Sequence, residues 1–268
     1  MILLDGSFGT CLWNKANKRG IENTPVWMYN KTHPDMVVEL CKEYFDAGTS
    51  IIQTNTFSAN KETLDRFSWD LKEVITLATD IAKKAREGYE GKKISLDVGP
   101  LPRYLDPIGD MTEKEAEEGF SQIIDAGLIA GVDQIFLETF TDLNLMKIAA
   151  KCALESKLPV FCSFSFDKRG RTLCGDFPED IAKHLAEMGV NAVGINCSFG
   201  PKAAVDVLKA YKKALSGSDM KLIFKPNVDE GMTPDAFADE CLLAADIADY
   251  MGACCGSSPE YIKALAIK

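Results

Sequence analysis

The sequence has 268 residues, of which 46% are hydrophobic and 26% charged, and 30 basic against 40 acidic residues give a formal net charge of −10. Nucleic acids and anionic membrane surfaces attract dense positive charge, so we expect neither of them as a partner of this acidic chain. No apolar run approaches the roughly 18 residues of a membrane span, and no basic, cleavable leader is evident, so we expect a cytoplasmic protein.

Eight short runs rich in β-branched and aromatic residues predict eight strands. In chain order they cover Ile2–Asp5, Ile51–Phe57, Ile94–Gly99, Gln134–Phe140, Val160–Phe166, Ala192–Ser198, Leu222–Val228 and Asp249–Cys255. Most of these runs are apolar throughout their first half. That pattern is typical of parallel strands that are covered on both faces.

Amphipathic segments between the strands predict helices, among them Met36–Ala47, Glu113–Ala130 and Leu143–Ser156. Asp35 opens the first of these segments, Asp142 precedes the third, and Thr112 precedes the second with Glu115 placed for a capping box. Prolines at helix starts and glycines at helix ends support the same division of the chain: Pro201, Pro234, Pro259, Gly48, Gly131 and Gly189.

Strands that alternate with helices in units of roughly 30 residues predict a single α/β domain over residues 1–268, a (β/α)8 TIM barrel. A doubly wound dinucleotide-binding sheet is the alternative, but the run Asp5–Thr10 after the first strand lacks the G-x-G-x-x-G pattern. The longest stretch without a predicted element is Cys11–Pro34, which we expect to be a long loop.

Polar or thiol side chains stand at the carboxyl end of every predicted strand, where a barrel of this kind places its active site. In chain order they are Asp5, Thr54, Asn55, Asp97, Glu138, Ser163, Ser165, Asn196, Cys197, Asn227, Cys254 and Cys255. Any one of them has a plainer reading, because Asp, Ser and Asn also cap the helices that follow strands. Their recurrence at all the strand ends indicates a functional mouth.

The chain contains nine cysteines, an odd number that argues against a complete disulfide framework. Cys197 ends the sixth predicted strand and Cys254-Cys255 end the eighth, and a closed barrel separates these strands by one neighbour. Adjacent residues on a regular strand point to opposite faces, so Cys254 and Cys255 can reach one ion only on an irregular backbone. Gly252 and Gly256 allow such a backbone.

Three thiolates with a vacant fourth position describe a catalytic zinc site, and an all-sulfur ligand set suits the binding of an external thiol as its thiolate. A redox-active vicinal pair and simple burial remain as alternatives. Most of the other cysteines are expected to pack as small hydrophobic residues: Cys41, Cys152, Cys162 and Cys241. Cys11 and Cys174 follow strands and are candidates for the lining of the mouth.

Taken together, these motifs resemble the homocysteine S-methyltransferase family, and most of all the homocysteine-binding module of cobalamin-dependent methionine synthase. The motifs that carry the resemblance are Asp5–Thr10, Thr54–Phe57, Asp97–Pro100, Glu138–Phe140, Gly194–Cys197 and Gly252–Cys255. The resemblance implies that the protein transfers a methyl group to the thiol of homocysteine and so forms methionine. It also implies a zinc ion held by Cys197, Cys254 and Cys255.

The resemblance further implies a set of substrate-binding residues: Asp5, Gly6, Ser7, Asn55, Glu138 and Asn196. Asp5 and Glu138 match the acidic residues that hold the ammonium group of homocysteine, and a buried cation does need carboxylate partners. The backbone N–H groups of Gly6 and Ser7 are candidates for binding the carboxylate of the substrate. Asn227 matches an Asn that takes the fourth zinc position when substrate is absent.

Several features depart from the pattern of the family. Ala253 and Ser257 stand where a Gly and a Thr are usual, and Lys225 stands where an acidic or aromatic residue is more usual. The sequence ends without a cobalamin-binding unit, and neither His33 nor His184 has the context of a cobalamin ligand. We therefore expect an external donor, and we favour methylcobalamin on a separate corrinoid protein over a small onium compound such as S-methylmethionine or betaine.

Two alternatives come from other classes of protein. A Schiff-base aldolase barrel would use Lys225, which shares strand parity with Asn227 and so would point into the barrel with it. A zinc-buffering or redox-sensing protein would use the vicinal pair Cys254 and Cys255 without catalysis. The aldolase predicts a carbonyl substrate trapped on the lysine, whereas a metal store predicts no added thiolate on the metal.

Overall fold

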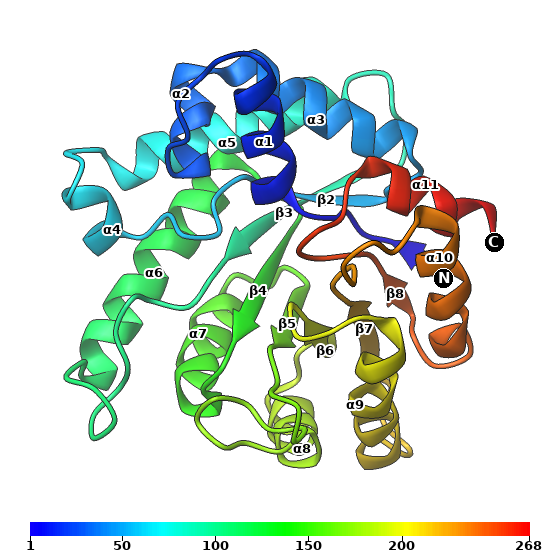
Figure 1. The fold of residues 1–268 in the computed structure, drawn as a ribbon. Helices are drawn as coiled ribbons and strands as arrows, with labels where there is room; N and C mark the ends of the chain where they lie inside the picture. Colours follow the sequence, from blue (N-terminus) through cyan, green and yellow to red (C-terminus); the bar gives the residue numbers. More distant parts are fainter.

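The computed structural model describes all 268 residues, and its eight strands form one parallel sheet. The strand order is β1-β8-β7-β6-β5-β4-β3-β2. Leu4, just after β1, bridges Ile51 at the start of β2, and this contact closes the sheet. Figure 1 shows the helices arranged around the strands. The predicted (β/α)8 barrel is therefore confirmed.

Strands and helices alternate along the chain as predicted, although several strands are shorter than expected because their polar ends bend into loops. The strands are β1 (Ile2–Leu3), β2 (Ile51–Gln53), β3 (Lys93–Val98), β4 (Gln134–Phe140), β5 (Val160–Phe164), β6 (Ala192–Asn196), β7 (Lys221–Lys225) and β8 (Tyr250–Met251). The helices are α1 (Phe8–Lys18), α2 (Tyr29–Thr32), α3 (Pro34–Asp46), α4 (Lys61–Asp65), α5 (Leu71–Arg86), α6 (Glu113–Ala130), α7 (Leu143–Glu155), α8 (Pro178–Met188), α9 (Pro201–Ala214), α10 (Pro234–Cys241) and α11 (Pro259–Ile267). Two short 3-10 turns, Val26–Met28 and Leu242–Ala244, complete the set.

Most helices begin where the sequence signals placed them. Thr112 and Glu115 form the expected capping box at the start of α6. The carboxylate of Asp142 accepts hydrogen bonds from the first turn of α7, and α9, α10 and α11 each begin at the expected proline. Helix α3 begins at Pro34 rather than at Met36, because proline is already compatible with the first helical turn.

The long loop expected over Cys11–Pro34 is wrong, because this stretch is largely helical. Helix α1 begins at Phe8, and a 3-10 turn and α2 follow it before α3. The hydroxyl of Ser7 caps the first turn of α1, and Leu12 and Ala16 are buried one turn apart on its inner face. Apart from the capping serine, this narrow apolar stripe is the main sequence signal of the helix, which explains why the sequence pattern did not predict it.

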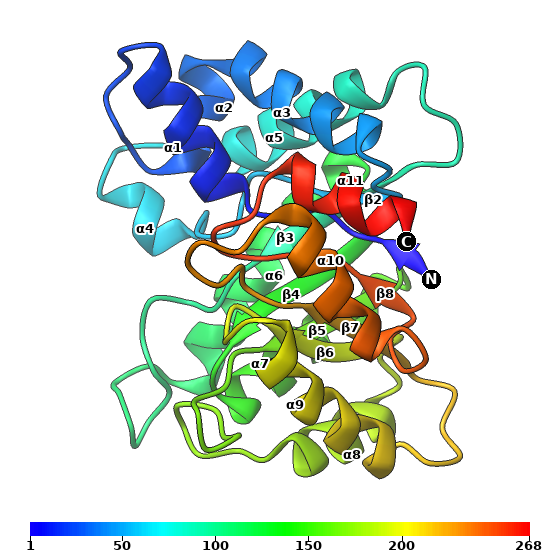
Figure 2. The same cartoon turned by 45° about the vertical axis from the view of Figure 1, so that its right-hand side comes forward.

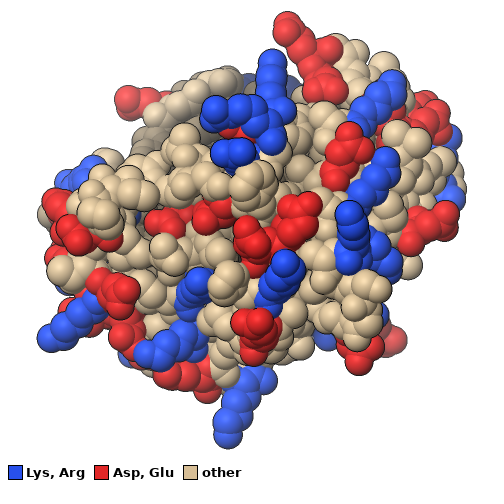
Figure 3. All heavy atoms as spheres, turned by 90° about the horizontal axis from the view of Figure 1, so that it is seen from below, with Lys and Arg blue, Asp and Glu red and all other residues tan.

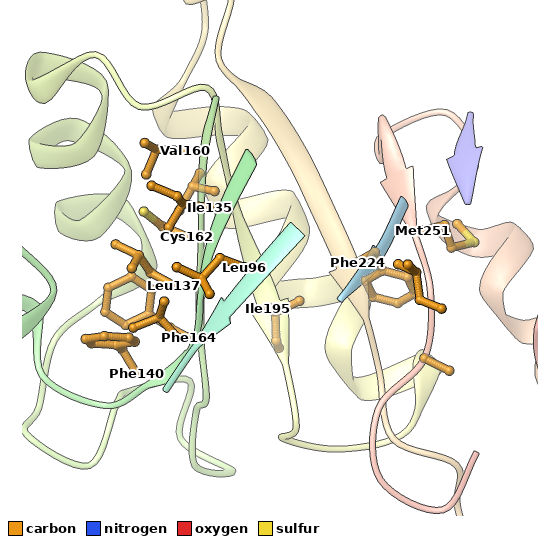
Figure 4. Close-up of a cluster of buried hydrophobic side chains, with 14 of the residues drawn as sticks. Leu96, Ile135, Leu137, Phe140, Val160, Cys162, Phe164, Ile195, Phe224 and Met251 are labelled. Atoms are coloured by element: carbon orange, nitrogen blue, oxygen red, sulfur yellow. The ribbon is translucent and has the colours of Figure 1, made fainter. Parts of the chain in front are cut away.

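Two hydrophobic clusters lie on either side of the barrel wall. A cluster of 67 buried residues fills the space between strands and helices, and Figure 4 shows Leu137, Cys162 and Phe224 among its members. A second cluster fills the amino-terminal half of the barrel interior: Leu4, Ile51, Phe136, Phe161, Ala192 and Ile223. Side chains on a strand alternate between its faces, so Leu137 faces the helices while Phe136 faces the interior.

The exterior of the barrel brings the two chain ends together. Strand β1 pairs with β8, and the amino and carboxyl termini lie side by side in Figures 1 and 2.

On the face of the molecule seen in Figure 3, acidic and basic side chains are interspersed, and neither sign forms a continuous patch. No helix combines the length and the apolarity that crossing a bilayer requires.

Candidate metal and acceptor site

The barrel interior changes from apolar to polar within two residues along four of its strands. Four members of the interior apolar cluster, Ile51, Phe136, Phe161 and Ile223, are followed two positions later by the buried polar residues Gln53, Glu138, Ser163 and Lys225. Inward positions on a strand are two residues apart, so these polar side chains form the next layer toward the carboxyl ends of the strands. A polar layer therefore lies on an apolar floor.

Three thiols meet at the carboxyl ends of β6 and β8, and we call Cys197, Cys254 and Cys255 the thiol cluster. Their sulfur atoms all lie within 4.8 Å of one another, and the Sγ atoms of Cys197 and Cys255 are 3.2 Å apart. The structure thus brings together the three cysteines that the sequence placed at the ends of the sixth and eighth strands. No other group of potential metal ligands is this compact in the described chain.

The backbone around the thiol cluster is irregular. Cys197 has a φ of 49°, in the left-handed region that costs a non-glycine residue on the order of 1–3 kcal/mol. Gly256 has a φ of 81°, which a residue without a side chain adopts freely. Gly252 serves a different purpose, because a Cβ there would lie 2.6 Å from the backbone oxygen of Asp5. Conformational freedom at Gly256 and close packing at Gly252 together place the two adjacent cysteines.

The pKa values of the cysteines in the thiol cluster are shifted in opposite directions. Hydrogen bonds from Cys197 and Cys254 lower the pKa of Cys255 to about 3. Hydrogen bonding to Cys197 and Cys255, together with burial, raises the pKa of Cys254 well above its usual value. The thiolate is the form of cysteine that binds metal ions, so Cys255 is the thiol best prepared for that purpose.

Asn196 connects the thiol cluster to the neighbouring strands. Its Oδ1 accepts hydrogen bonds from the hydroxyl of Ser163 at 2.9 Å and from the backbone N–H of Thr139 at 3.2 Å. Its Nδ2 donates to the hydroxyl of Thr139 at 2.6 Å and lies 3.8 Å from the Sγ of Cys254. These contacts fix the amide in one orientation, and its nitrogen faces a cysteine sulfur.

Asn227 lies between the two loops that carry the cysteines. Its backbone N–H donates to the carbonyl of Phe199, and the N–H of the next residue, Val228, donates to the carbonyl of Cys255, both at 3.0 Å. The side-chain Oδ1 of Asn227 is buried and has no hydrogen-bond partner. The protein therefore leaves this oxygen without a hydrogen-bond partner of its own. The three thiols fit the preference of zinc for cysteine ligands in a four-coordinate site with one further position.

A buried lysine lies between two carboxylates beside the thiol cluster. The Nζ of Lys225 is 3.0 Å from Asp5 Oδ1 and 2.9 Å from Glu138 Oε1, and it also donates to Gln53 Oε1. Only 2% of Lys225 is exposed. Burial alone would lower the pKa of Lys225, but attraction to Asp5 and Glu138 raises it above its usual range, so the amine is charged. We call these four residues the lysine–carboxylate cluster.

The charge and the contacts of Lys225 disfavour the Schiff-base alternative. A lysine that attacks a carbonyl group must present a neutral amine with a free lone pair. The Nζ of Lys225 instead donates to three acceptors inside the barrel and is held in its charged form. The structure therefore assigns this lysine an electrostatic part rather than a nucleophilic one.

Ser257 ties the loop after β1 to the cysteine loop. Its hydroxyl accepts the backbone N–H of Ser7 at 3.0 Å and donates to the carbonyl of Cys254 at 2.7 Å. A Cβ on Gly6 would lie 2.5 Å from the same hydroxyl, so this contact requires glycine. The N–H of Ser7 is thus used within the protein, whereas the N–H of Gly6 donates to no protein atom and stays a candidate for binding the substrate carboxylate.

Asn55 fastens the segment before α3 to the end of β2. Its Nδ2 donates to the carbonyl of Val26 at 2.7 Å and to Asn30 Oδ1 at 2.9 Å, and Asn30 donates back to the carbonyl of Asn55. The Asn55 side chain was expected to bind substrate. Both hydrogens of its amide nitrogen are instead used in hydrogen bonds to this segment.

The burial of the remaining cysteines agrees with their positions in the sequence. Those expected to pack in the core are all buried: Cys41, Cys152, Cys162 and Cys241. Cys11 is also buried, on α1, where its thiol donates to the carbonyl of Ser257. Cys174 is half-buried in the loop after β5.

The sequence reasoning missed Gln53 and Thr139. Gln53 is a polar residue at the end of an apolar run, and that contrast is a usable signal of an inward polar position. Thr139 has a φ of 61° beside a register shift between β4 and β5, and no sequence signal marks it.

Comparison with known proteins agrees with this geometry. The family model described as homocysteine S-methyltransferase matches residues 2–268. The chain belongs to the homocysteine S-methyltransferase family. Methionine synthase from Mycobacterium leprae is 24% identical in an alignment of 289 positions, gaps included, that covers 98% of this chain and 24% of that protein, so the chain spans about a quarter of that relative. Betaine–homocysteine S-methyltransferase 1 from Rattus norvegicus is 26% identical in an alignment of 300 positions that covers 99% of this chain and 71% of that protein.

Solved structures share the same fold. The metallated form of the homocysteine methyltransferase MmuM from Escherichia coli superposes with a TM-score of 0.84 at 23% identity and covers 100% of this chain and 96% of its own. The oxidized form of the same protein gives a TM-score of 0.83 at 21% identity, with 100% and 95% covered. At this level of identity the likeness concerns the barrel itself.

Proposed function

We propose that the chain is a zinc-dependent methyltransferase that moves a methyl group to the thiol of homocysteine and so forms methionine. The observation that carries this proposal is the thiol cluster, in which Cys197, Cys254 and Cys255 hold their sulfur atoms within 4.8 Å of one another. Membership of the homocysteine S-methyltransferase family supports homocysteine as the acceptor. A metal store with no catalytic part is the simpler reading of three thiols, and family membership argues against it.

Different residues of the site would bind the metal ion, orient a metal ligand and bind the acceptor. The thiol cluster would hold the zinc ion, which when bound lowers the pKa of an acceptor thiol so that the thiolate predominates at neutral pH. Asn196 orients Cys254, and the free N–H of Gly6 is available to the carboxylate of the acceptor. Asp5 and Glu138 are the residues that the family resemblance assigns to the ammonium group, and in this chain Lys225 already binds both.

The transfer itself is a displacement at carbon. The acceptor sulfur, already free of its proton, attacks the methyl carbon in line with the bond to the donor, and the electron pair of that bond leaves with the donor. The product is a thioether without negative charge, which is a weaker ligand for a metal than a thiolate. No protein base has to act at the moment of transfer.

For the methyl donor we propose methylcobalamin presented by a separate corrinoid protein. Support comes from the run Asp5–Thr10, which resembles the methionine synthase module, and from the match of 98% of the chain to the methionine synthase of Mycobacterium leprae. The test is methionine formation by zinc-loaded protein with methylcobalamin, S-methylmethionine and betaine in parallel. Turnover with either onium compound and none with methylcobalamin would contradict the proposed donor.

The zinc ligands are tested by Cys255→Ser, with Cys174→Ser as the matched control because it removes another accessible thiol outside the cluster. We expect the wild type and Cys174→Ser to hold one zinc ion per chain. Cys255→Ser should lose metal affinity by more than the roughly 10–100-fold that altering an outer-shell partner costs, and methyl transfer should fall with it. Full zinc content together with full transfer in Cys255→Ser would overturn the proposed function.

A further inference from the structure

Lys225 stands between Asp5 and Glu138, where the family resemblance puts the ammonium group of the acceptor. We propose that Lys225 is a built-in substitute for that ammonium, so that the site binds thiol carboxylates without an α-amino group as readily as it binds homocysteine. The inference rests on the proposed function and names the class of acceptor that the same site takes.

The first support is that the three donors of the Lys225 amine and both oxygens of Asp5 are already engaged inside the protein. An ammonium group has three donors, and the Nζ of Lys225 has three acceptors on three other strand ends: Asp5, Gln53 and Glu138. The other oxygen of Asp5 accepts the backbone N–H of Gln53 at 2.6 Å, and the side chain of Asp5 is fully buried. Both oxygens of Asp5 therefore already accept a hydrogen bond inside the protein, and the burial of the side chain keeps them from an acceptor in the mouth.

The second support is electrostatic. Two buried carboxylates without a counter-ion demand a cation, because isolated buried charges are costly. Lys225 meets that demand from within the protein at 3.0 and 2.9 Å from the two carboxylates. An acceptor ammonium at Glu138 would share this carboxylate with the Nζ of Lys225, and like charges within about 4–6 Å of each other are disfavoured.

The third support is that Lys225 is fixed in place. A Cβ on Gly252 would lie 3.3 Å from the Cγ of Lys225, so the glycine leaves room for the stem of the lysine. The Nζ lies 5.3 Å from the centre of the Phe136 ring, which adds a cation–π contact from the apolar floor. With 2% of its surface exposed, the lysine is part of the barrel interior and not a mobile arm at its mouth.

The other two binding groups of the acceptor remain available. A thiol binds at the thiol cluster, and a carboxylate has the free N–H of Gly6. The compound 4-mercaptobutyrate has the same carbon chain, thiol and carboxylate as homocysteine and lacks only the amino group. Comparing the two compounds isolates the contribution of the ammonium.

The test is a titration of the cobalt-substituted wild-type protein with each thiol, followed by the rise in thiolate-to-cobalt absorbance, which reports binding without turnover. We expect dissociation constants for homocysteine and 4-mercaptobutyrate that agree within about threefold, a difference under 1 kcal/mol. A preference for homocysteine of about tenfold or more would overturn the inference while leaving the proposed function standing. If neither thiol changes the spectrum, the proposed function falls and the inference falls with it.

A pair of variants sharpens the test. Lys225→Met empties the place between the two carboxylates, so we expect the folded variant to prefer homocysteine by about tenfold or more. Lys221→Met is the control, because Lys221 is on the same strand with a half-exposed side chain and pairs with Asp249 instead. The control should keep the wild-type ratio. A folded Lys225→Met protein with the wild-type ratio would overturn the inference, and if that variant does not fold, the wild-type ratio decides alone.

Discussion

The thiol cluster and the lysine–carboxylate cluster occupy the same end of one barrel, yet the protein holds them by different means. The thiols stand on irregular backbone, where Cys197 has a φ of 49° and Asn196 faces Cys254. Lys225 stands on the regular strand β7 and Glu138 on β4 at its register shift, and the two side chains are held by opposite charge. The thiol cluster converges on a place for an external ion, whereas the lysine–carboxylate cluster finds its partners inside the protein.

The largest effect should come from removing the cation of the lysine–carboxylate cluster. In Lys225→Met, Asp5 and Glu138 keep their burial and lose their counter-ion, so we expect a loss of about 3–5 kcal/mol in the free energy of unfolding. Lys221→Met removes a half-exposed ion pair and should cost under about 1 kcal/mol. Urea unfolding of both variants measures the difference. Equal losses would show that charge does not hold the cluster.

The thiol cluster should respond in metal affinity rather than in stability. Asn196→Ala removes the amide that faces Cys254, and we expect zinc affinity, measured by competition with a chromogenic chelator, to fall about 10–100-fold. Asn191→Ala is the matched control, because Asn191 precedes the same strand and accepts the N–H of Val160 at 2.7 Å. The control should lose stability and keep its metal affinity. Unchanged affinity in Asn196→Ala would break the contrast between the two clusters.

Asp97 is a further buried carboxyl group close to the lysine–carboxylate cluster, and its protonation can be tested by the pH dependence of stability. Burial, with Glu138 nearby, raises the pKa of Asp97 well above its usual value, and its Oδ1 has no hydrogen-bond partner. A carboxyl group whose folded pKa is raised binds more protons in the folded state than in the unfolded state. Stability should therefore fall as the pH rises above the unfolded pKa of Asp97, by up to about 1.4 kcal/mol per pH unit, until the folded pKa is passed.

The measurement is urea unfolding of the wild type and Asp97→Asn across this pH range. The variant should lose most of the fall in stability, since its amide does not titrate. Asp206→Asn, which removes an exposed carboxylate on α9, should keep the wild-type profile. Identical pH profiles in the wild type and Asp97→Asn would show that Asp97 is not protonated in the folded protein.

The smallest effect should come from the contact between the two loops. Ser257→Ala removes the acceptor for the N–H of Ser7 and the donor to the carbonyl of Cys254, so we expect a loss of about 1–2 kcal/mol in stability. Ser258→Ala is the neighbouring control, because the Ser258 side chain makes no capping hydrogen bond at the start of α11. Thermal unfolding distinguishes the two variants. A loss in Ser258→Ala as large as in Ser257→Ala would mean that the loop contact is not what the hydroxyl provides.

The sequence predicted the barrel because its signals are local. Apolar runs marked the strands, and residues such as Thr112 and Asp142 marked helix starts that need only their own first turn. Helix α1 escaped prediction because its apolar stripe is short: Phe8, Cys11, Leu12 and Ala16. Local sequence patterns do not predict a helix whose buried face has few apolar residues.

The sequence predicts the thiol cluster better than it predicts the lysine–carboxylate cluster. The thiols could be grouped because barrel closure alone puts the ends of β6 and β8 one strand apart. Strand parity also placed Lys225 inside the barrel, but its partners come from three other strands, and which of them a long side chain reaches is a property of the folded interior. The end of an apolar run marks Gln53 as an inward polar position, but its hydrogen bond with Lys225 could not be predicted from the sequence.

The layered interior has a further consequence for how this site can change over time. On β4 the floor residue Phe136 and the site residue Glu138 are two positions apart, with the helix-facing Leu137 between them. Losing one residue early in this strand would turn Glu138 toward the helices and Leu137 into the mouth. Insertions and deletions inside the strands therefore damage packing and chemistry together. New specificities in such a barrel have to arise by substitution at the inward positions or by changes in the loops.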